Sequence, residues 1–397
     1  MDSALSGVTV VDLTQVMAGP FCTQLLADFG ARVIKVERPG AGDQSRRSMG
    51  HPMRGEDSAA FLAINRNKHS VAVDLKTARG RQLAQRMAGA ADVFVQNFRP
   101  GVVGDLGLDY PTLSALNPGL VYASISGFGQ HGPYVQRPGY DLIAQAMSGV
   151  MSVTGNPGEP PVKAGIPIGD LAAGLFTAFG VVSALHARGR TGLGQHVDVS
   201  LLDSAFALSV WETAELWSTG RVPGRLGSAH RVLAPYQALR ARDGYLTVGA
   251  NNDRQWRGLC ATIGREDLLA DPRFSSNTAR LDNREPLAAE LEATLRTRDV
   301  ADWVADLLAA GVPCGPIQDY AQASADPQLG ERDMVATVDH PVEGTMRVLG
   351  IPVRLSATPG RVVDPAPLLG QHTRAVLAWL GLSEREVDEL FEQGVVA

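Results

Sequence analysis

The chain has 397 residues, of which 45% are hydrophobic and 20% are charged, a balance typical of soluble globular proteins. Its formal net charge of −6 and its lack of long basic runs disfavour nucleic acid as the main partner. Its three cysteines, Cys22, Cys260 and Cys314, lie far apart and in no metal-binding spacing. They favour a reducing compartment, the cytoplasm, and no disulfide framework.

The sequence predicts no signal peptide and no membrane partner. The first residues lack the basic stretch that precedes the apolar part of a signal peptide. The apolar run at 171–187 is short for a membrane span, contains Gly174 and Gly180, and directly follows an acid. We therefore expect this run to form a buried helix.

The first 130 residues alternate between apolar strand patterns and helix patterns. We expect strands at 7–13, 31–37, 70–75, 92–98 and 119–129, and helices at 19–30 and 78–90. Short apolar strands separated by helices indicate a doubly wound parallel sheet of the α/β class. Ligands bind beyond the carboxyl ends of such strands, which directs attention to the loops 15–20, 37–46, 96–101 and 127–141.

The second half of the chain predicts a smaller domain inserted into the first. A helix at 171–186, a strand at 196–203 and helical residues to 219 are followed by a hairpin at 234–250 that turns at Asp243-Gly244. Helices follow at 253–264, 283–297 and 300–311, and then strands at 334–340 and 346–355 and a terminal helix pair. We expect a large domain at 1–224, a small α/β domain at 225–325, and a return to the large domain at 326–397.

A nicotinamide-dependent enzyme is disfavoured. Its fingerprint, G-x-G-x-x-G, belongs directly after the first strand, but the loop there reads "TQVMAGPF". The glycines at 189–194 follow a helix and precede a strand, which is the wrong context.

One acid stands out in the stretch "GIPIGDLAAG", at 165–174. Asp170 precedes a long apolar helix, where an aspartate is commonly an N-cap. The same position would suit a nucleophile held near backbone N–H groups, which would also stabilise an oxyanion. Its small neighbours, Gly169 and Ala172 among them, leave room for a bulky substrate, but they are equally expected where helices pack tightly. Spacing alone leaves both interpretations open.

Several long motifs resemble the class III CoA-transferases, the CaiB/BaiF family, from end to end. They are "VVDLTQVMAGPFCTQLLADFGARVIKVERPGAGDQSR", "NRNKHSVAVDL", "VQNFRPG", "SGFGQHGPYVQRPGYDLIAQAMSG", "GIPIGDLAAG", "APYQ", "GVPCGPI", "DHPVEG" and "PLLGQHT". The resemblance implies a Rossmann-like large domain, an inserted smaller α/β domain and an interlocked homodimer. It also implies that Asp170 attacks an acyl-CoA thioester, forming an aspartyl anhydride and then an aspartyl-CoA thioester.

A racemase of the same fold is the alternative activity. Relatives of that kind pair the aspartate with a histidine, where this chain has Tyr140. A tyrosine with an ordinary pKa near 10 is a poor partner for proton exchange near neutral pH. His131 lies nearest in sequence and would have to replace it. A CoA-binding protein without catalysis is a further alternative, which the retention of Asp170 in its motif disfavours.

The resemblance also implies where CoA lies. It places Arg38 against the adenine, where a guanidinium can stack on the base and pair with phosphate. It places Asn97, Arg99, Arg137 and Tyr140 along the CoA channel. Each of these side chains would otherwise be an ordinary solvated loop residue.

Two positions depart from the family pattern. Formyl-CoA-type relatives carry glutamine where this chain has Met17, so a polar role is lost there. They also carry a glycine-run loop over the aspartate, but the matching segment at 225–237, "RLGSAHRVLAPYQ", has no such run.

The acceptor acid is expected to be a dicarboxylate, because the chain looks most like the glutarate, mesaconate and malate branch of the family. A second carboxylate would need a cationic partner, and Arg46, Arg66 and His230 are the candidates. The two arginines could equally be surface or interface charges. The resemblance implies an acyl-CoA and a small carboxylic acid as substrates, with no metal or redox cofactor.

Overall fold

The protein is described as a computed structural model of residues 3–51 and 53–397. The chain forms two compact units. The first comprises residues 1–150, 163–213 and 327–397, and the second comprises 151–162 and 214–326. The segment predicted as the small domain, 225–325, falls within the second unit.

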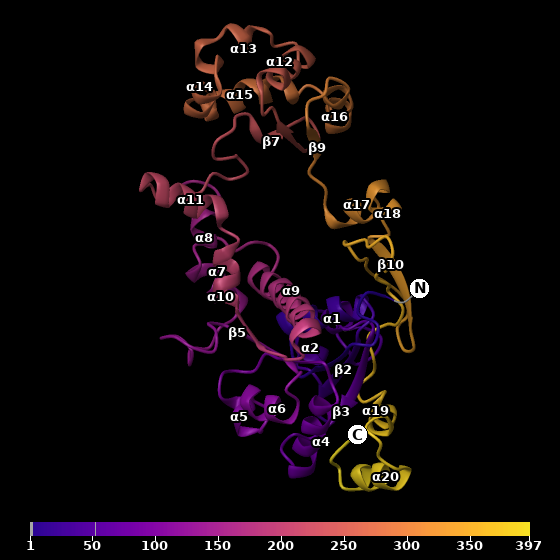
Figure 1. The fold of residues 1–397 in the computed structure, drawn as a ribbon. Coiled ribbons are helices and arrows are strands. Elements are labelled where there is room, and N and C mark those ends of the chain that lie inside the picture. Colours follow the sequence, from indigo (N-terminus) through magenta and orange to yellow (C-terminus); the bar gives the residue numbers. More distant parts are fainter. Residues whose placement is uncertain (1–2, 52) are drawn as a thin grey trace. The chain divides into compact units, whose positions relative to one another are not determined.

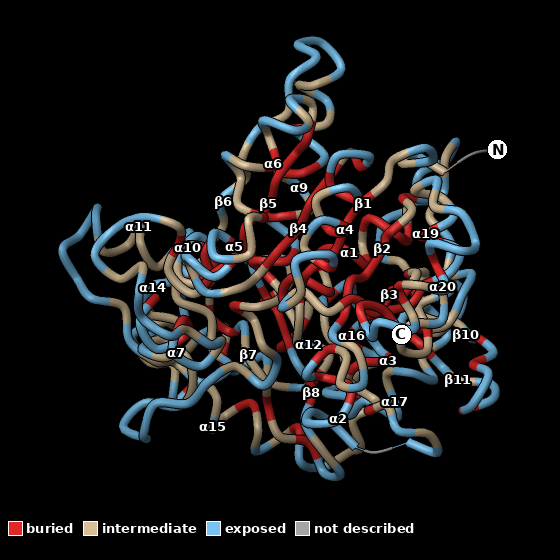
Figure 2. Tube along the Cα trace, turned by 90° about the horizontal axis from the view of Figure 1, so that it is seen from below, coloured by how far each residue is buried: buried red, intermediate tan, exposed pale blue. Residues whose placement is uncertain are grey.

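A six-stranded parallel sheet forms the centre of the first unit, which confirms the predicted α/β architecture. Its strands are β1 (Thr9–Asp12), β2 (Arg32–Glu37), β3 (Lys68–Ala72), β4 (Val93–Gln96), β5 (Val121–Ser126) and β6 (His196–Ser200). The inner strands are nearly continuous apolar runs because helices cover both faces of a parallel sheet. Figure 2 shows these strands among the buried parts of the chain.

The strand order is β3-β2-β1-β4-β5-β6. From β1, the chain first adds β2 and β3 on one side and then adds β4, β5 and β6 on the other. In register, Val10 of β1 lies opposite Val33 of β2 on one side and Val93 of β4 on the other. The chain leaves β1 and β4 on opposite sides of this point, so a crevice opens beyond their carboxyl ends. The crevice is therefore the expected place for a ligand.

Helices flank the sheet. Those of the first unit are α1 (Ala18–Asp28), α2 (Ser45–Ser48), α3 (Ala59–Ile64), α4 (Ala78–Gly89), α5 (Val102–Asp105), α6 (Tyr110–Leu116), α7 (Asp141–Met147), α9 (Ile168–Thr191), α10 (Leu201–Ala207), α18 (Pro327–Glu331), α19 (Thr373–Trp379) and α20 (Glu384–Glu392). Two more, α8 (Val150–Val153) and α11 (Val210–Thr219), begin in this unit and end in the other. In Figure 1, α9 lies beside α1, and the two pack against each other.

The end of the chain returns to the first unit and joins the edge of the sheet. The backbone N–H of His372 donates to the Ser70 carbonyl at 2.9 Å, and Val396 forms a bridge with Val73. A hairpin of β10 (Val335–His340) and β11 (Gly344–Leu349) precedes this return. The predicted strand at 346–355 was too long, since pairing stops at Leu349 ahead of a proline that has no N–H to donate.

The second unit is built on an antiparallel sheet of β7 (Tyr236–Arg240), β8 (Tyr245–Gly249) and β9 (Cys314–Pro316). The predicted hairpin at 234–250 is confirmed. The helices of this unit are α12 (Asp253–Thr262), α13 (Asp267–Ala270), η1 (Pro272–Phe274), α14 (Asn277–Asp282), α15 (Arg284–Leu295), α16 (Val300–Ala309) and α17 (Tyr320–Ser324). Trp256, Phe274 and Trp303 lie in its own buried core.

Two local features differ from the prediction and bear on the site. The strand expected at 196–203 ends at Ser200, whose hydroxyl accepts the N–H of Asp203 at 2.9 Å and so starts α10. The short helix α7 was not predicted, and the loop expected at 127–141 ends at the first residue of this helix. Asp141, its first residue, proves important below.

The helix α9 is the one described helix long and apolar enough to cross a membrane by composition. Helices in the cores of soluble proteins meet the same criterion, so this is weak evidence for a membrane. Part of its apolar surface is exposed in the single chain, so the helix predicted as buried is buried on only part of its surface.

Candidate active site

Two adjoining cavities lie at the crevice beyond β1 and β4. The first has a volume of about 210 Å³ and is lined by residues that follow β1, β2 and β3, including Leu13, Arg38 and Lys76. The second has a volume of about 280 Å³ and is lined by residues 15–18, 97–100, 137–140 and 170, among others. Gln15 and Phe98 line both cavities, so a single elongated ligand could occupy them together.

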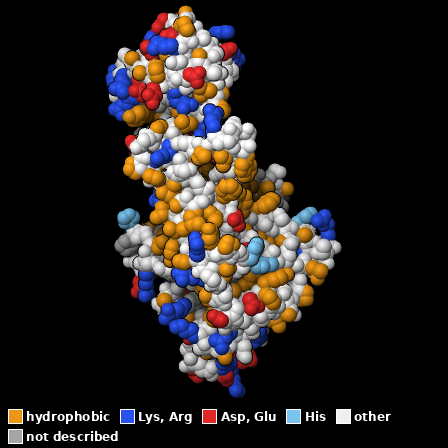
Figure 3. Space-filling view, turned by 90° about the vertical axis from the view of Figure 1, so that its left-hand side faces the viewer, with side chains coloured by type: hydrophobic (Ala, Val, Ile, Leu, Met, Phe, Trp, Pro, Cys, Tyr) orange, Lys and Arg blue, Asp and Glu red, His pale blue; other side chains and the backbone are white. Residues whose placement is uncertain are grey.

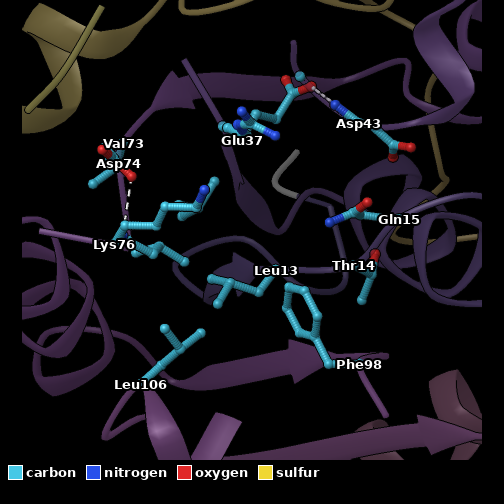
Figure 4. Close-up of a pocket in the computed structure, with 14 residues that line it drawn as sticks. Leu13, Thr14, Gln15, Glu37, Asp43, Val73, Asp74, Lys76, Phe98 and Leu106 are labelled. Carbon is cyan, nitrogen blue, oxygen red and sulfur yellow. Dashed lines mark hydrogen bonds between the residues drawn. The ribbon is translucent and has the colours of Figure 1, made fainter. Parts of the chain in front are cut away.

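The first cavity combines an apolar wall with exposed cations. In Figure 4, Leu13, Phe98 and Leu106 line one side and Glu37 lies on the other. Arg38 and Lys76 are exposed, and no ion pair of either side chain is formed within the described residues. Their charges therefore remain available to an anionic ligand.

Asp170 lies in the first turn of α9 and lines the second cavity. The N-cap of this helix is Pro167, so Asp170 does not cap it and the N-cap interpretation is wrong. The carboxylate is half-buried and accepts no hydrogen bond from any described part of the chain. Burial and the nearby charge of Asp141 raise the pKa of Asp170 to about 7. A carboxylate of this kind, unbonded and basic, is suited to attack an electrophile.

Asp141 supplies the cap that Asp170 does not. Its Oδ1 accepts the backbone N–H groups of Gly169 at 2.8 Å and of Asp170 at 3.3 Å. Its Oδ2 accepts the side-chain amide of Gln145 at 2.6 Å. The free donors at the start of α9 are thus already satisfied, and the expectation that they stabilise an oxyanion is wrong for this arrangement.

Close helix packing brings the start of α1 to Asp170. A Cβ atom on Gly174 would lie 2.8 Å from the Ala18 carbonyl oxygen, so only glycine permits this approach of α9 to α1. The small residues that follow Asp170 therefore serve helix packing. Met17 and Ala18 line the same cavity as Asp170, and their N–H groups make no hydrogen bond with the described residues. Unbonded donors at a helix start carry partial positive charge, and here they belong to residues that line the cavity.

Four residues predicted for the CoA channel line the second cavity with Asp170: Asn97, Arg99, Arg137 and Tyr140. Arg38 lines the first cavity instead. Arg137 places its guanidinium 3.8 Å from the centre of the Tyr134 ring, and Tyr140 is 69% exposed.

Asn97 is held by the backbone, which the sequence did not suggest. Its Oδ1 accepts the Gln15 N–H at 2.8 Å, and its Nδ2 donates to the Gln15 carbonyl at 2.7 Å. The amide therefore braces the loop after β1, and both of its polar atoms are occupied.

Arg46 and Arg66 are buried and paired with acids inside the protein. Arg46 donates from Nε and Nη2 to the two oxygens of Glu37, at 2.7 and 2.8 Å, and from Nη1 to Asp57 at 2.7 Å. Arg66 is bonded in the same way to Asp28, at 2.9 and 2.6 Å. Both guanidinium groups are committed to internal partners, so the hypothesis that they bind a substrate carboxylate loses its physical basis.

Histidine side chains do not line the Asp170 cavity in the described part of the chain. His131 is exposed and lies 3.6 Å from an Asp198 oxygen, away from the lining residues. His230 belongs to the second unit, where its Nδ1 accepts the Val232 N–H at 3.2 Å and its ring lies 5.0 Å from that of Tyr236.

The structure adds residues that sequence reasoning missed. Leu75 and Lys76 follow β3 and line the first cavity, so the rule that pointed to the other strand ends would have found them. Asp141 had no such signal, because an acid before a short apolar stretch looks like any helix start.

Comparison with known proteins identifies the family. The profile of CoA-transferase family III matches residues 5–373. The chain is 40% identical to the succinyl-CoA:glutarate CoA-transferase of Mus musculus, with 99% of this chain and 90% of that protein covered. It is 42% identical to the acetyl-CoA:oxalate CoA-transferase of Acetobacter aceti, with 88% of each covered. A crystal structure of a CaiB/BaiF family protein from Brucella suis matches with a TM-score of 0.87 at 39% identity, covering 96% of this chain and 100% of that one.

Proposed function

The chain belongs to CoA-transferase family III, and from this premise we propose that it transfers CoA from succinyl-CoA, or a similar short dicarboxyl-CoA, to a free dicarboxylic acid. The relatives from mouse and Acetobacter are named for glutarate and oxalate, which are both dicarboxylates, and the first uses succinyl-CoA. Exchange of one thioester for another conserves energy, so the reaction calls for no ATP, metal or redox cofactor.

The observation that carries this proposal is the state of Asp170. Asp170 has a carboxylate that accepts no hydrogen bond from the described residues and a raised pKa. It also lies in a cavity lined by three loops with cationic or polar side chains. The buried carboxylates of Asp12, Asp28, Glu37 and Asp43 are each paired with an arginine or a lysine. Asp170 differs from all of these, as a nucleophile should.

In the proposed mechanism, an Asp170 oxygen attacks the thioester carbonyl of the donor. The C–S bond breaks, and the products are a mixed anhydride and the CoA thiolate. The thiolate then attacks the Asp170 carbonyl, breaking the anhydride C–O bond and releasing the donor acid as its carboxylate. The acceptor carboxylate attacks the resulting aspartyl-CoA thioester, and a second exchange through the anhydride gives the new acyl-CoA and restores Asp170.

The start of α1 is the best source of oxyanion stabilisation. Met17 and Ala18 line the Asp170 cavity and their N–H groups are unbonded among the described residues, while those of Gly169 and Asp170 are taken by Asp141. Backbone donors fixed before the reaction stabilise developing negative charge without reorganisation. This donor set replaces the one expected from the sequence.

CoA would extend across both cavities. Its phosphates need cations, and Arg38, Lys76 and Arg99 are exposed and form no ion pair with the described residues. The apolar wall of the first cavity, with Phe98 and Leu106, would suit the adenine, against which Arg38 can stack. The thioester would then reach the second cavity and Asp170.

A homodimer is supported by one face of the first unit. Apolar side chains are exposed together on α7, α9 and α10; they are Leu142, Ile143, Met147, Leu175, Phe176, Phe179, Val182 and Phe206. Figure 3, seen from the side on which α7 and α10 lie in Figure 1, shows hydrophobic side chains gathered on that face. Monomers rarely expose so much apolar surface, so we propose that a second copy covers it. Phe179→Arg on this face should yield monomers in light scattering; unchanged dimers would exclude α9 from the interface.

A reducing compartment such as the cytoplasm remains part of the proposal. Cys22, Cys260 and Cys314 are all free thiols. Cys22 and Cys260 are buried as free thiols, a state that suits a reducing compartment.

The test is incubation of the purified protein with succinyl-CoA and glutarate, itaconate, mesaconate, malate or oxalate, with acetyl-CoA as a second donor. Mass spectrometry would follow the CoA thioesters, and Asp170→Ala is the control. New thioesters that the control does not form would establish transfer and rank the acceptors. Deuterium entering the alpha carbon of a branched acyl-CoA, without any transfer, would instead identify a racemase.

A further inference from the structure

The loop that leads into α1 contains a strained residue. Val16 has φ of 71°, in the left-handed region that β-branched residues avoid. Its neighbours Gln15 and Met17 line the Asp170 cavity, and Val16 does so as well. Such strain persists only where surrounding contacts enforce it. The contacts around this loop therefore have to be identified.

Side chains hold three consecutive residues of the loop, and the first of them, Thr14, also donates its N–H to Asp12 Oδ1 at 2.8 Å. Lys35 Nζ donates to the Thr14 carbonyl at 2.8 Å. Asn97 binds both backbone polar groups of Gln15. Asp43 Oδ1 accepts the N–H of Val16 at 3.1 Å.

Lys35 and Asp43 are also paired with each other. Lys35 Nζ lies 2.8 Å from Asp43 Oδ2, and both side chains are fully buried. Asp43 Oδ1 further accepts the backbone N–H and the hydroxyl of Ser45, each at 2.8 Å. A buried ion pair is a weak source of stability because desolvation offsets most of the attraction. Lys35 lies on β2 and Asp43 lies in the loop that follows it, and the two bind the backbone of Thr14 and Val16. This geometry indicates that the pair fixes the conformation of the loop.

We infer that the Lys35–Asp43 pair is a positioning device that keeps Val16 left-handed, so that the N–H groups of Met17 and Ala18 face the Asp170 cavity. Rotation of Val16 to a negative φ would redirect the peptide that carries the Met17 N–H. The start of α1 would then no longer present both donors to the reacting carbonyl. The inference rests on the proposed function, in which these donors stabilise the oxyanion.

A double-mutant cycle with Val16 tests this role. Asp43→Asn keeps the shape but removes the charge, and an amide there cannot accept from Val16 while also pairing with Lys35. We expect kcat per folded enzyme to fall about tenfold to a hundredfold, while KM for the donor CoA changes by less than about twofold. Glycine adopts positive φ without strain. The double variant Val16→Gly/Asp43→Asn should therefore have a kcat about tenfold higher than Asp43→Asn alone.

A matched control separates positioning from folding. Asp28→Asn breaks a different buried ion pair of the same unit, Arg66–Asp28, whose residues line neither cavity. It should lower Tm while leaving kcat per folded enzyme within about twofold of the parent. If Asp43→Asn folds poorly, Lys35→Met/Asp43→Leu removes both charges and leaves none unpaired.

The outcomes decide between the two roles. Loss of kcat in either Asp43 variant, together with rescue by Val16→Gly, supports positioning. A parental kcat in the folded fraction, or a loss that Val16→Gly does not relieve, overturns it. Intact-mass detection of the CoA adduct on the parent enzyme, absent in Asp170→Ala, shows separately whether the proposed function itself holds.

Discussion

Asp170 and Asp43 line adjoining cavities at one edge of the sheet, but their ionisation is shifted in opposite directions. Burial and the Asp141 charge raise the pKa of Asp170 to about 7. Burial also acts to raise the pKa of Asp43, but the Lys35 ammonium and the N–H groups of Ser45 and Val16 lower it to about 2. The difference arises from the neighbours, since burial acts to raise the pKa of both carboxylates and Asp43 is the more deeply buried of the two.

This contrast separates an acid that holds structure from an acid suited to chemistry. Asp43 is saturated with donors, which fixes its position and makes it a poor nucleophile. Within the part of the chain that the structure describes, no group donates to the Asp170 carboxylate and Asp141 is its anionic neighbour, which leaves its oxygens basic and accessible. Burial alone would not have distinguished them.

The largest expected effect is the loss of transfer in Asp170→Ala. Without the nucleophile, neither the anhydride nor the aspartyl thioester can form, and kcat should fall by about a thousandfold or more. Quenched assays that follow product thioesters by mass would measure it. Residual activity within about tenfold of the parent would mean that Asp170 is not the nucleophile.

A smaller effect is expected at Asp141. The nucleophile must be ionised, so kcat/KM for the donor should rise with pH through about 7 as Asp170 loses its proton. Asp141→Asn removes the adjacent charge, so this midpoint should move to lower pH. A pH profile that stays in place would assign the midpoint to another group.

Arg38 offers a weaker test on the binding side. Its guanidinium is exposed beside the first cavity and unpaired among the described residues, so it should act on CoA and not on the chemical step. Arg38→Ala should raise KM for the acyl-CoA about tenfold with kcat nearly unchanged. Salt should weaken the effect, because exposed charges are screened. If Arg38→Ala raised KM equally for an acyl thioester that lacks the nucleotide part of CoA, the assignment of Arg38 to CoA binding would be contradicted.

Much of the fold was predictable because periodicity reports burial. The strands at 31–37 and 92–98 and the helix at 78–90 appear within a residue or two of their predicted bounds. Asp170 was singled out by the family motif, and its role as nucleophile stays a prediction. Its spacing alone left the N-cap interpretation open, which the structure overturns.

The remaining features depend on contacts between distant parts of the chain. Arg46 and Arg66 looked like substrate ligands until their internal partners, Glu37 and Asp28, were placed beside them. Asp141 caps a helix that begins 27 residues later in the sequence, at Ile168. No local pattern encodes such pairings, because only the folded chain brings the partners together.

The smallest expected effect is on stability, and it has opposite signs at the two acids. Asp170 is protonated in both states below about pH 4, but as pH rises to 7 the unfolded chain releases this proton first, which destabilises the native state. Asp170→Asn should therefore raise Tm at pH 8 by about 2–4 °C, equivalent to roughly 1 kcal/mol after allowance for partial exposure, and change it little at pH 4.

Asp43 stabilises the native state above about pH 4 and loses that contribution as pH falls toward 2. Asp43→Asn should thus lower Tm at pH 8, with a difference that narrows in acid. Thermal melts of both variants at pH 4 and pH 8 would measure this, and equal signs at pH 8 would show that the two acids are not tuned in opposite directions.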